Sequence, residues 1–319
     1  MTEEAYCRAG PSLALVKYWG KSVKGENLPA TPSLAVTLGE VHTETRVTLG
    51  HTDSVSVDGT PQDPTRFAPF FETLRTSLGV SAHFHASSRN TFPTSAGLAS
   101  SSSGFAALAG ACARAAGLDP SPTDLSSIAR AGSASAARSV FGGFVLLPAG
   151  GSRARQVFGP EHWPDLRIVV AVVAEGPKPV SSRRGMEATR ATSPYYFSWI
   201  KESAALLPEA LRAVRDRDVE LLGETARRSY SLMHGAILGG KPPLLYWLPG
   251  TVAVIHACAA LRAAGTGAWE TIDAGPQVKV LCLEKDTRTV VSAVAAADPA
   301  VRTIVCTAGP GLQYEPLAG

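Results

Sequence analysis

The sequence predicts an α+β protein in which helices cover layers of antiparallel sheet. Two observations predict this class. Apolar and polar residues alternate through much of the N-terminal third, most regularly over residues 33–50, as they do in strands of a half-exposed sheet. The second half runs in the order strand, three helices, two strands, helix and strand, which suits an antiparallel sheet beneath a layer of helices.

A connection rich in Gly, Pro and Arg occupies residues 148–165 and separates these two halves. Such a composition interrupts regular structure and is typical of a boundary. We therefore expect an N-terminal domain over residues 1–164 and a C-terminal domain over residues 165–319. The length of 319 residues accommodates one large or two ordinary domains.

In the N-terminal half, strand patterns alternate with helical ones. Strands are expected at residues 12–20, 33–50, 55–59 and 82–88. A helix is expected near Arg66–Leu78. A second helix of about 18 residues follows a run of serines and ends at Gly117, as glycine commonly ends a helix. A third helix is expected to begin with Thr123 as its N-cap, and a strand follows the glycine pair at 142–143.

The C-terminal half begins with a continuous apolar segment that is typical of a buried strand. Helical periodicity and strand patterns then follow in turn. The expected elements are a strand at 166–175, helices within 186–237 and at 249–265, a strand pair at 268–284, a helix at 286–297 and a strand at 302–308.

Composition excludes several classes of protein. Hydrophobic residues make up 45% and charged residues 18%, as in soluble globular proteins. A net charge of +3 without a basic stripe argues against a nucleic-acid partner. The apolar run at Ile168–Ala174 is too short to span a bilayer, and the acidic N-terminal segment does not resemble a signal peptide. Five scattered cysteines without a CxxC pair indicate free thiols. We expect a cytoplasmic protein with no membrane partner.

Lysine is unusually rare in this chain. The sequence has 22 arginines and 8 lysines, and the short segment KYWGK holds two of those lysines, Lys17 and Lys21. They are candidates for binding an anion. A strand end whose lysines face water explains the same segment equally well.

The segment FPTSAGLASSSSGFAAL, residues 92–108, has the composition of a phosphate-binding loop. Gly97 permits backbone conformations that a Cβ excludes, and the following helix offers free N–H groups and a partial positive charge. The four serines at 100–103 add hydroxyl donors, or a ligand for a phosphate-bound magnesium ion. No lysine follows the second glycine, so this is not the G-x-x-x-x-G-K-[ST] loop. The alternative is a capped helix that uses serines for close packing.

Three other segments carry clusters of polar residues. Ser133, Ser135 and Arg138 lie within two helical turns, and an arginine there can bind a carboxylate or phosphate through two hydrogen bonds. Asp273 ends a strand before a Gly-Pro turn, where it is either a functional carboxylate or a residue that serves its own turn. Two serines and two arginines at 181–184 suit a second anion, or are solvated surface residues. No HExxH, zinc spacing or G-x-S-x-G motif competes with these sites.

Taken together, these segments closely resemble the diphosphomevalonate decarboxylases, a family of the GHMP kinase superfamily. They occur in family order from about Ser12 to Leu281. The matching segments are LALVKYWGK, LPATPSLAVTL, FPTSAGLASSSSGFAALA, RAGSASAARSVFGGFV, KPVSSRRGM, MHGAILGGKPPLLYW and TIDAGPQVKVL.

The resemblance implies a fold and an assembly. The N-terminal domain is expected to be ribosomal-protein-S5-domain-2-like, with a left-handed βαβ unit. The C-terminal domain is expected to be ferredoxin-like, and the active site to lie in the cleft between the two. The resemblance also implies a homodimer.

The resemblance further implies an activity. Family members use ATP and magnesium to phosphorylate the 3-hydroxyl of (R)-5-diphosphomevalonate. This transfer releases ADP, and loss of the new phosphate together with carbon dioxide then gives isopentenyl diphosphate, on the mevalonate route to isoprenoids. Phosphorylation matters because a tertiary hydroxide is a poor leaving group and phosphate is a good one.

The resemblance assigns roles residue by residue. Asp273 would orient the 3-hydroxyl and accept its proton, Arg138 would pair with the C1 carboxylate, and Lys17 would support either the catalytic aspartate or the phosphates. The residues expected to bind the substrate are Tyr18, Lys21, Ser133, Ser135, Arg138, Ser182 and Arg183. Those expected to bind the ATP phosphates are Gly97, Leu98, Ala99, Ser100, Ser101 and Ser102, and Ser101 is also a possible magnesium ligand, the metal being held mostly through ATP.

The sequence departs from the family pattern at a few positions. Ser12 stands where an asparagine is common, Thr31-Pro32 replaces an Asn-Ser or Asn-Asn pair, and Gln277 replaces an asparagine. Alternatives to be distinguished are therefore a decarboxylase or 3-kinase acting on mevalonate 5-phosphate or mevalonate, and a non-catalytic nucleotide-binding paralogue. Lys21 favours a diphosphate substrate, and the presence of both Asp273 and Arg138 favours catalysis with decarboxylation.

Overall fold

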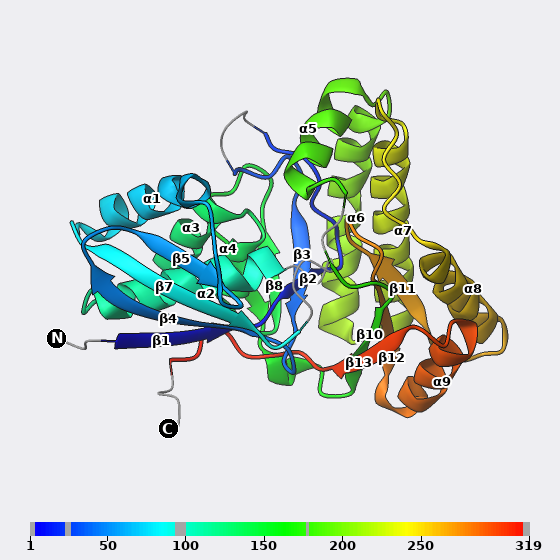
Figure 1. Cartoon of the computed structure of the whole chain (residues 1–319). Helices are drawn as coiled ribbons and strands as arrows, with labels where there is room; N and C mark the ends of the chain where they lie inside the picture. Colours follow the sequence, from blue (N-terminus) through cyan, green and yellow to red (C-terminus); the bar gives the residue numbers. More distant parts are fainter. Residues whose placement is uncertain (1–3, 23–26, 93–99, 177–178, 315–319) are drawn as a thin grey trace.

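The computed structural model describes residues 4–22, 27–92, 100–176 and 179–314. Figure 1 shows two lobes side by side, with the strands β2, β3 and β8 standing between them. The expected α+β class is confirmed, because three sheets are each flanked by helices. The predicted site residues Gly97, Leu98 and Ala99 lie outside the described residues.

The N-terminal lobe is built on a five-stranded sheet with the order β1-β4-β7-β5-β6. Its pairs are antiparallel except β5 with β7, which are parallel and joined through helix α1. The expected antiparallel character therefore holds for all but one pair. The bounds of these elements are β1 Glu4–Ala9, β4 Thr43–Gly50, β5 Ser54–Val57, β6 Thr60–Pro61, the 3-10 turn η1 Pro64–Arg66, α1 Ala68–Leu78 and β7 His83–Asn90.

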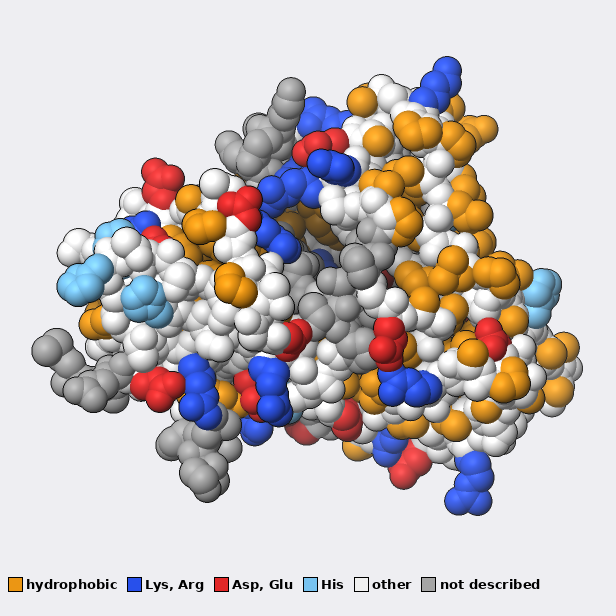
Figure 2. Space-filling view, viewed as in Figure 1, with side chains coloured by type: hydrophobic (Ala, Val, Ile, Leu, Met, Phe, Trp, Pro, Cys, Tyr) orange, Lys and Arg blue, Asp and Glu red, His pale blue; other side chains and the backbone are white. Residues whose placement is uncertain are grey.

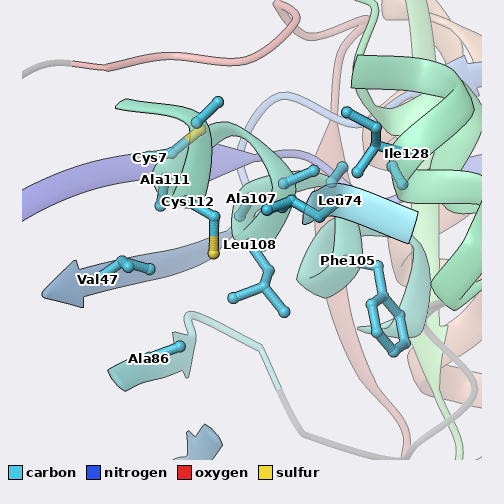
Figure 3. Close-up of a cluster of buried hydrophobic side chains, with 14 of the residues drawn as sticks. Cys7, Val47, Leu74, Ala86, Phe105, Ala107, Leu108, Ala111, Cys112 and Ile128 are labelled. Carbon is cyan, nitrogen blue, oxygen red and sulfur yellow. The ribbon is translucent and has the colours of Figure 1, made fainter. Parts of the chain in front are cut away.

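The core of this lobe follows from strand alternation. On β7, exposed and buried residues alternate, so that Phe84 and Ala86 point inward. Helix α2 (Ser100–Ala115) lays small residues against this face, and small side chains let the helix approach the sheet closely. Figure 3 shows Phe105 and Leu108 of α2 among side chains from the sheet and from neighbouring helices.

A four-stranded sheet with the order β2-β3-β8-β9 lies between the lobes. Every residue of β2, β3 and β8 is buried. The expectation of a half-exposed sheet over residues 33–50 is therefore wrong for β3, because its sheet lies between the two lobes, and it holds for β4, where buried and more exposed residues alternate. The bounds are β2 Ser12–Ala14, β3 Ser33–Thr37, α3 Pro122–Gly132, α4 Ala136–Ser139, β8 Phe144–Leu147, β9 Arg155–Phe158 and η2 Pro160–His162.

Of two predictions about helix ends, the one for Gly117 is confirmed and the one for Thr123 is wrong. The serine helix α2 ends two residues before Gly117, whose φ of +74° is the left-handed conformation expected of a C-terminal glycine. The predicted N-cap Thr123 is wrong. Ser121 caps α3 instead, accepting a hydrogen bond from the Asp124 N–H at 3.2 Å, because Pro122 occupies the first helical position and the cap must precede it.

The C-terminal lobe contains an antiparallel sheet with the order β11-β12-β10-β13. Its elements follow the predicted order of strand, helices, two strands, helix and strand, except that four helices (α5 to α8) lie between β10 and β11 where three were predicted. The bounds are β10 Leu166–Val172, α5 Ser182–Thr192, α6 Tyr196–Asp216, α7 Val219–Leu238, α8 Pro249–Ala263, β11 Trp269–Ile272, β12 Val278–Leu283, η3 Glu284–Asp286, α9 Thr287–Ala297 and β13 Arg302–Cys306.

The two lobes share a hydrophobic core. Leu34 and Phe144 of the middle sheet pack in one cluster with Ile168 and Leu281 of the C-terminal sheet. After β13 the chain returns to the N-terminal lobe, where Gln313 exchanges two backbone hydrogen bonds with Arg8. The boundary between residues 164 and 165 stays a prediction.

Two expectations from composition concern cysteines and membranes. All five cysteines are buried and free, as predicted. Across the residues described, the structure contains no helix with the length and apolar character needed to cross a membrane.

The core of the N-terminal lobe yields a prediction about stability. Leu74 is fully buried on α1, so Leu74→Ala is expected to lower the free energy of unfolding by about 2–5 kcal/mol, through lost burial and a residual cavity. Leu49→Ala is the matched control, because Leu49 is 45% exposed and its truncation is expected to cost no more than about 0.5 kcal/mol. Urea unfolding followed by circular dichroism measures both, and equal losses would contradict this placement of Leu74.

Candidate active site

A cleft of about 570 Å³ lies between the lobes and is lined from both sides. Figure 2 shows Lys and Arg side chains gathered beside the hollow between the lobes. The predicted site residues that line the cleft are Lys17, Tyr18, Lys21, Ser100, Ser101, Ser133, Ser135, Arg138, Ser182, Arg183 and Asp273. Segments far apart in the sequence therefore meet at one place.

Asp273 follows β11 directly and lines the cleft, with 25% of its side chain exposed. Its Oδ1 accepts a hydrogen bond from Lys17 Nζ at 2.7 Å and its Oδ2 from Lys279 Nζ at 3.1 Å. Burial raises the pKa of Asp273, but the two ammonium groups outweigh burial and hold that pKa below its ordinary value. The carboxylate thus stays ionised. The turn after β11 is closed instead by the backbone, through the Gly275 N–H and the Asp273 carbonyl at 2.8 Å.

Lys17 is buried, with 1% of its side chain exposed, so it does not face water as a strand end would. Besides Asp273, its Nζ donates to the carbonyl of Ala14 at 2.8 Å. Its backbone N–H donates to Ser229 Oγ at 2.8 Å, which ties this segment to α7. Burial lowers the pKa of Lys17 to about 8, and the negative charge of Asp273 partly opposes this shift.

Arg138 is 2% exposed and is fixed in orientation by two serines. Its Nε donates to Ser12 Oγ at 3.0 Å and its Nη1 to Ser33 Oγ at 2.6 Å. Burial lowers the pKa of Arg138 to about 10, with Asp273 opposing the shift, so the guanidinium remains charged at neutral pH. A planar cation held in this way presents its remaining donors to the cleft in a defined direction.

The four serines at the start of α2 differ in their surroundings. Ser100 and Ser101, at the N-terminus of α2, line the cleft. Ser102 and Ser103 are fully buried: Ser102 Oγ accepts the Ser12 N–H at 3.1 Å, and Ser103 Oγ lies 2.6 Å from Thr43 Oγ1. Close packing is therefore the role of the second pair, and the first pair faces the cleft, where phosphate binding by Ser100 and Ser101 stays a prediction. The predicted role of Ser102 in phosphate binding stays a prediction.

At another part of the cleft, cations and hydroxyls come from both lobes. Lys21 is close enough to Arg183 for their charges to repel, so burial and this repulsion together lower the pKa of Lys21. The Tyr18 hydroxyl is buried and has no hydrogen-bond partner among the described residues, and burial raises its pKa. Ser182 opens helix α5, which Ser181 caps by accepting the Arg184 N–H at 3.3 Å. Two cations that repel each other, beside a hydroxyl without a partner among the described residues, suit a bound anion.

Three further residues at or beside the cleft were missed by the sequence analysis. Arg66 and Asn27 line it. Lys279 is 2% exposed and contacts the second oxygen of Asp273. A signal for Lys279 was present, because it is the one charged residue in the apolar strand VKVLCL and the chain has few lysines. Arg66 stands in a polar turn and gave no such signal.

The departures from the family pattern have different structural consequences. Ser12 lines the cleft and holds Arg138. Thr31 is fully buried, and its Oγ1 donates to the carbonyl of Lys17 at 3.4 Å. The Gln277 side chain accepts the Val173 N–H at 2.5 Å and secures the end of β10. Gln277 therefore supports the sheet and does not line the cleft.

The fold and this site place the chain in the GHMP kinase superfamily, because a serine-rich helix N-terminus and an aspartate face one cleft between two α+β lobes. Comparison with known families is more specific. The family described as diphosphomevalonate decarboxylase-like N-terminal domain matches residues 9–157, and the mevalonate 5-diphosphate decarboxylase C-terminal domain matches residues 168–308. The chain belongs to the diphosphomevalonate decarboxylase family.

Individual relatives agree with this membership. The diphosphomevalonate decarboxylase of Candida albicans is 35% identical, covering 84% of this chain and 81% of the relative. The mevalonate diphosphate decarboxylase of Enterococcus faecalis is 34% identical and superimposes with a TM-score of 0.89 over 98% of each chain. A structure described as MDDEF in complex with MVAPP, AMPPCP and magnesium is 35% identical, with a TM-score of 0.90 over 98% of each chain.

Gly20, which lies between the cleft residues Trp19 and Lys21, gives a prediction about stability. Gly20 has a φ of +110°, and a Cβ built on it lies 2.2 Å from the Tyr196 hydroxyl. Gly20→Ala is expected to destabilise the protein through both backbone strain, about 1–2 kcal/mol, and this clash. Gly59→Ala isolates the first effect, because Gly59 has a φ of +77° and open space around it. Thermal unfolding compares the variants, and an equal loss in both would refute the close contact with Tyr196.

Proposed function

We propose that this chain catalyses the ATP-dependent decarboxylation of (R)-5-diphosphomevalonate to isopentenyl diphosphate, ADP, phosphate and carbon dioxide, as a step of the mevalonate route to isoprenoids. One observation carries the proposal. The carboxylate of Asp273 and the guanidinium of Arg138 line the same cleft as the N-terminus of the serine helix. Family membership and the ligands named for MDDEF support it.

The serine helix provides the nucleotide side of the cleft. Ser100 and Ser101 line it at the N-terminus of α2, where free N–H groups and the helix dipole favour phosphate. The lysine missing from this loop is replaced by cations from other segments, among which Arg66 also lines the cleft. ATP fits such a surface as a co-substrate.

Magnesium would be held mainly through ATP. In the described part of the chain, no group of three or more His, Cys, Asp or Glu side chains is placed to hold a metal ion. The phosphate oxygens of the nucleotide would therefore supply most ligands, with the Ser101 hydroxyl as a candidate from the protein. A magnesium ion bound there neutralises charge on the phosphates during phosphoryl transfer.

The substrate diphosphate is assigned to the cationic part of the cleft. Lys21 and Arg183 repel each other in its absence, and an anion between them relieves that repulsion. The Tyr18 hydroxyl, which lacks a partner among the described residues, can then donate to a phosphate oxygen. Ser133, Ser135 and Ser182 line the same cleft and add hydroxyl donors.

Asp273 is assigned to the 3-hydroxyl. Both of its oxygens contact lysines, so the carboxylate is fixed, ionised and weakly basic. A weak base suffices, because phosphoryl transfer passes through a loose transition state in which positioning and charge stabilisation dominate. The hydroxyl oxygen attacks the terminal phosphorus of ATP, the bond between that phosphorus and the bridging oxygen of ADP breaks, and Asp273 accepts the hydroxyl proton.

Arg138 is assigned to the elimination. The C3–O bond breaks and phosphate leaves with the electron pair. The C1–C2 bond breaks, and its electrons form the C2=C3 double bond as carbon dioxide departs. Arg138, held by Ser12 and Ser33, would keep the C1 carboxylate aligned with the breaking C3–O bond.

The proposed assembly and location of the protein follow from its thiols, its net charge and its exposed apolar residues. We propose a cytoplasmic homodimer that takes no nucleic-acid or membrane partner. The buried free thiols suit a reducing compartment, and the net charge of +3 is small for nucleic-acid binding. Strongly exposed apolar residues at the start of α6, Tyr195 at 59% and Phe197 at 81%, suit contact with a second subunit.

The direct test incubates the purified protein with magnesium-ATP and, separately, mevalonate, mevalonate 5-phosphate and mevalonate 5-diphosphate. We expect equal amounts of ADP and carbon dioxide with the diphosphate only. ADP without carbon dioxide would identify a 3-kinase. Turnover confined to the monophosphate would overturn the substrate assignment, and no turnover with any of the three would favour a non-catalytic nucleotide-binding protein.

Asp273→Asn tests the role assigned to that carboxylate. The variant is expected to lose stability, because two buried ammonium groups lose their counter-ion, but to fold on the core that the two lobes share and to bind ATP through the unchanged serine helix. It is expected to lose nearly all turnover, because the amide neither accepts the proton nor carries the negative charge. Asp165→Asn is the control, because Asp165 is exposed beside the start of β10. ADP release measures turnover and fluorescent-nucleotide titration measures binding. Robust turnover in Asp273→Asn would remove the assigned role.

A further inference from the structure

We propose that Lys279 is a positioning residue for Asp273: together with Lys17 it forms a two-lysine clamp that fixes the carboxylate and keeps it facing the cleft. The inference rests on the proposed function, because it assumes that Asp273 acts on the substrate hydroxyl. Lys279 itself is given no contact with substrate.

The clamp follows from the β11–β12 hairpin. In this antiparallel pair Ile272 lies opposite Val278 and Thr271 opposite Lys279, so Asp273 begins the turn that joins the strands. Lys279 lies one residue inside the hairpin, is 2% exposed, and reaches Asp273 Oδ2 at 3.1 Å. Strand β12 thus places the Lys279 ammonium group against the carboxylate of Asp273, which lies in the turn of the same hairpin.

Each of the two lysines contacts a different oxygen of the Asp273 carboxylate. Lys17 Nζ contacts Oδ1 at 2.7 Å, and Lys279 Nζ contacts Oδ2. One contact leaves a carboxylate free to rotate about its Cβ–Cγ bond, whereas two contacts on different oxygens set the plane of the group. The lysines come from opposite ends of the sequence and both are buried, so neither shifts easily.

The other groups that face Asp273 do not substitute for Lys279. Arg138 of α4 acts on it at longer range and is held by its serines. His234 of α7 lies with Nε2 3.2 Å from the Asp273 carbonyl, and burial lowers its pKa to about 4, so it is neutral at pH 7. Removing the Lys279 ammonium therefore takes away one of two directly bonded positive charges.

The loss of that charge has a defined sign at two groups. Lys17 and Lys279 hold down the pKa of Asp273 against the effect of burial, so this pKa is expected to rise when an uncharged residue replaces Lys279. The pKa of Lys17 also rises, because Lys279 is one of the charges that lower it. The reaction needs an ionised Asp273 and a protonated Lys17. When the Lys279 charge is removed, the acid limb and the alkaline limb of the pH–activity profile are therefore both expected to move to higher pH.

Lys279→Met tests the proposal, because methionine keeps an unbranched apolar stem without the charge. At pH 7 we expect kcat for ADP release to fall about 10- to 100-fold, a size typical of a displaced catalytic group, with KM for ATP changed little. Both limbs of the pH profile of kcat should move to higher pH. Lys279→Arg, which keeps a charge, should restore most of the pH profile. Lys285→Met is the matched control, as Lys285 is exposed in the segment that follows β12.

A second readout does not depend on activity. Carbon-13 NMR of protein labelled at the aspartate side-chain carboxyl identifies the Asp273 signal by its absence in Asp273→Asn. We expect this signal to titrate at higher pH in Lys279→Met than in the parent. Should Lys279→Met not fold, Lys279→Gln replaces it in both measurements.

Two results overturn the clamp: a lower kcat with unmoved limbs and an unmoved NMR titration, which indicates support of the hairpin alone, or a variant indistinguishable from the parent. These outcomes are separate from failure of the proposed function, which is seen when the parent protein itself releases no carbon dioxide. In that case the NMR titration still decides whether Lys279 controls Asp273.

Discussion

The pairing of Asp273 with Lys17 and Lys279 is the interaction on which the arrangement of this protein depends. Buried charges are costly unless they are paired and hydrogen-bonded. Here a carboxylate that is only partly exposed meets two ammonium groups that are almost wholly buried. Because Lys17 lies near the start of the chain and the other two residues lie in the β11–β12 hairpin, the pairing requires the two lobes to come together. The hydrophobic core shared by the middle sheet and the C-terminal sheet supports the same arrangement.

A second network links the nucleotide side of the cleft to the arginine. Ser102 of the serine helix accepts the Ser12 N–H, the Ser12 hydroxyl accepts from Arg138 Nε, and Ser33 holds Arg138 Nη1. Short serine side chains make these contacts because β2, β3 and α2 lie close together, with small residues between them. Ser12 therefore holds Arg138 with its hydroxyl and binds Ser102 with its backbone amide, at a position where the family resemblance leads us to expect an asparagine.

The sequence was sufficient for the fold class, the order of most elements and the residues that meet in the cleft. Alternation and apolar runs revealed strands because burial imposes those patterns, and polar residues such as Asp273 and Arg138 stood out beside apolar segments. It was insufficient where the answer depended on packing. Lys279 was overlooked because strand alternation says nothing about which buried residue pairs with a charge. Thr123 is not the N-cap of α3, because Pro122 takes the first helical position and the cap, Ser121, must precede it. The division between Ser101 and Ser102 depends on which way a helix faces, and a run of four serines cannot indicate it.

The distribution of positive charge explains how a chain with a net charge of only +3 can hold two polyanions. Lys17 and Lys279 share the single negative charge of Asp273, so their main contribution is to hold that carboxylate in position. Arg138, Lys21 and Arg183 form no salt bridge with a carboxylate in the part of the chain described, yet all three line the cleft. The repulsion between Lys21 and Arg183 is relieved when an anion binds between them, so part of the attraction for substrate is built into the fold. Separating the cations that position the carboxylate from those that bind phosphate lets Asp273 remain ionised without competing for the charges that the substrate needs.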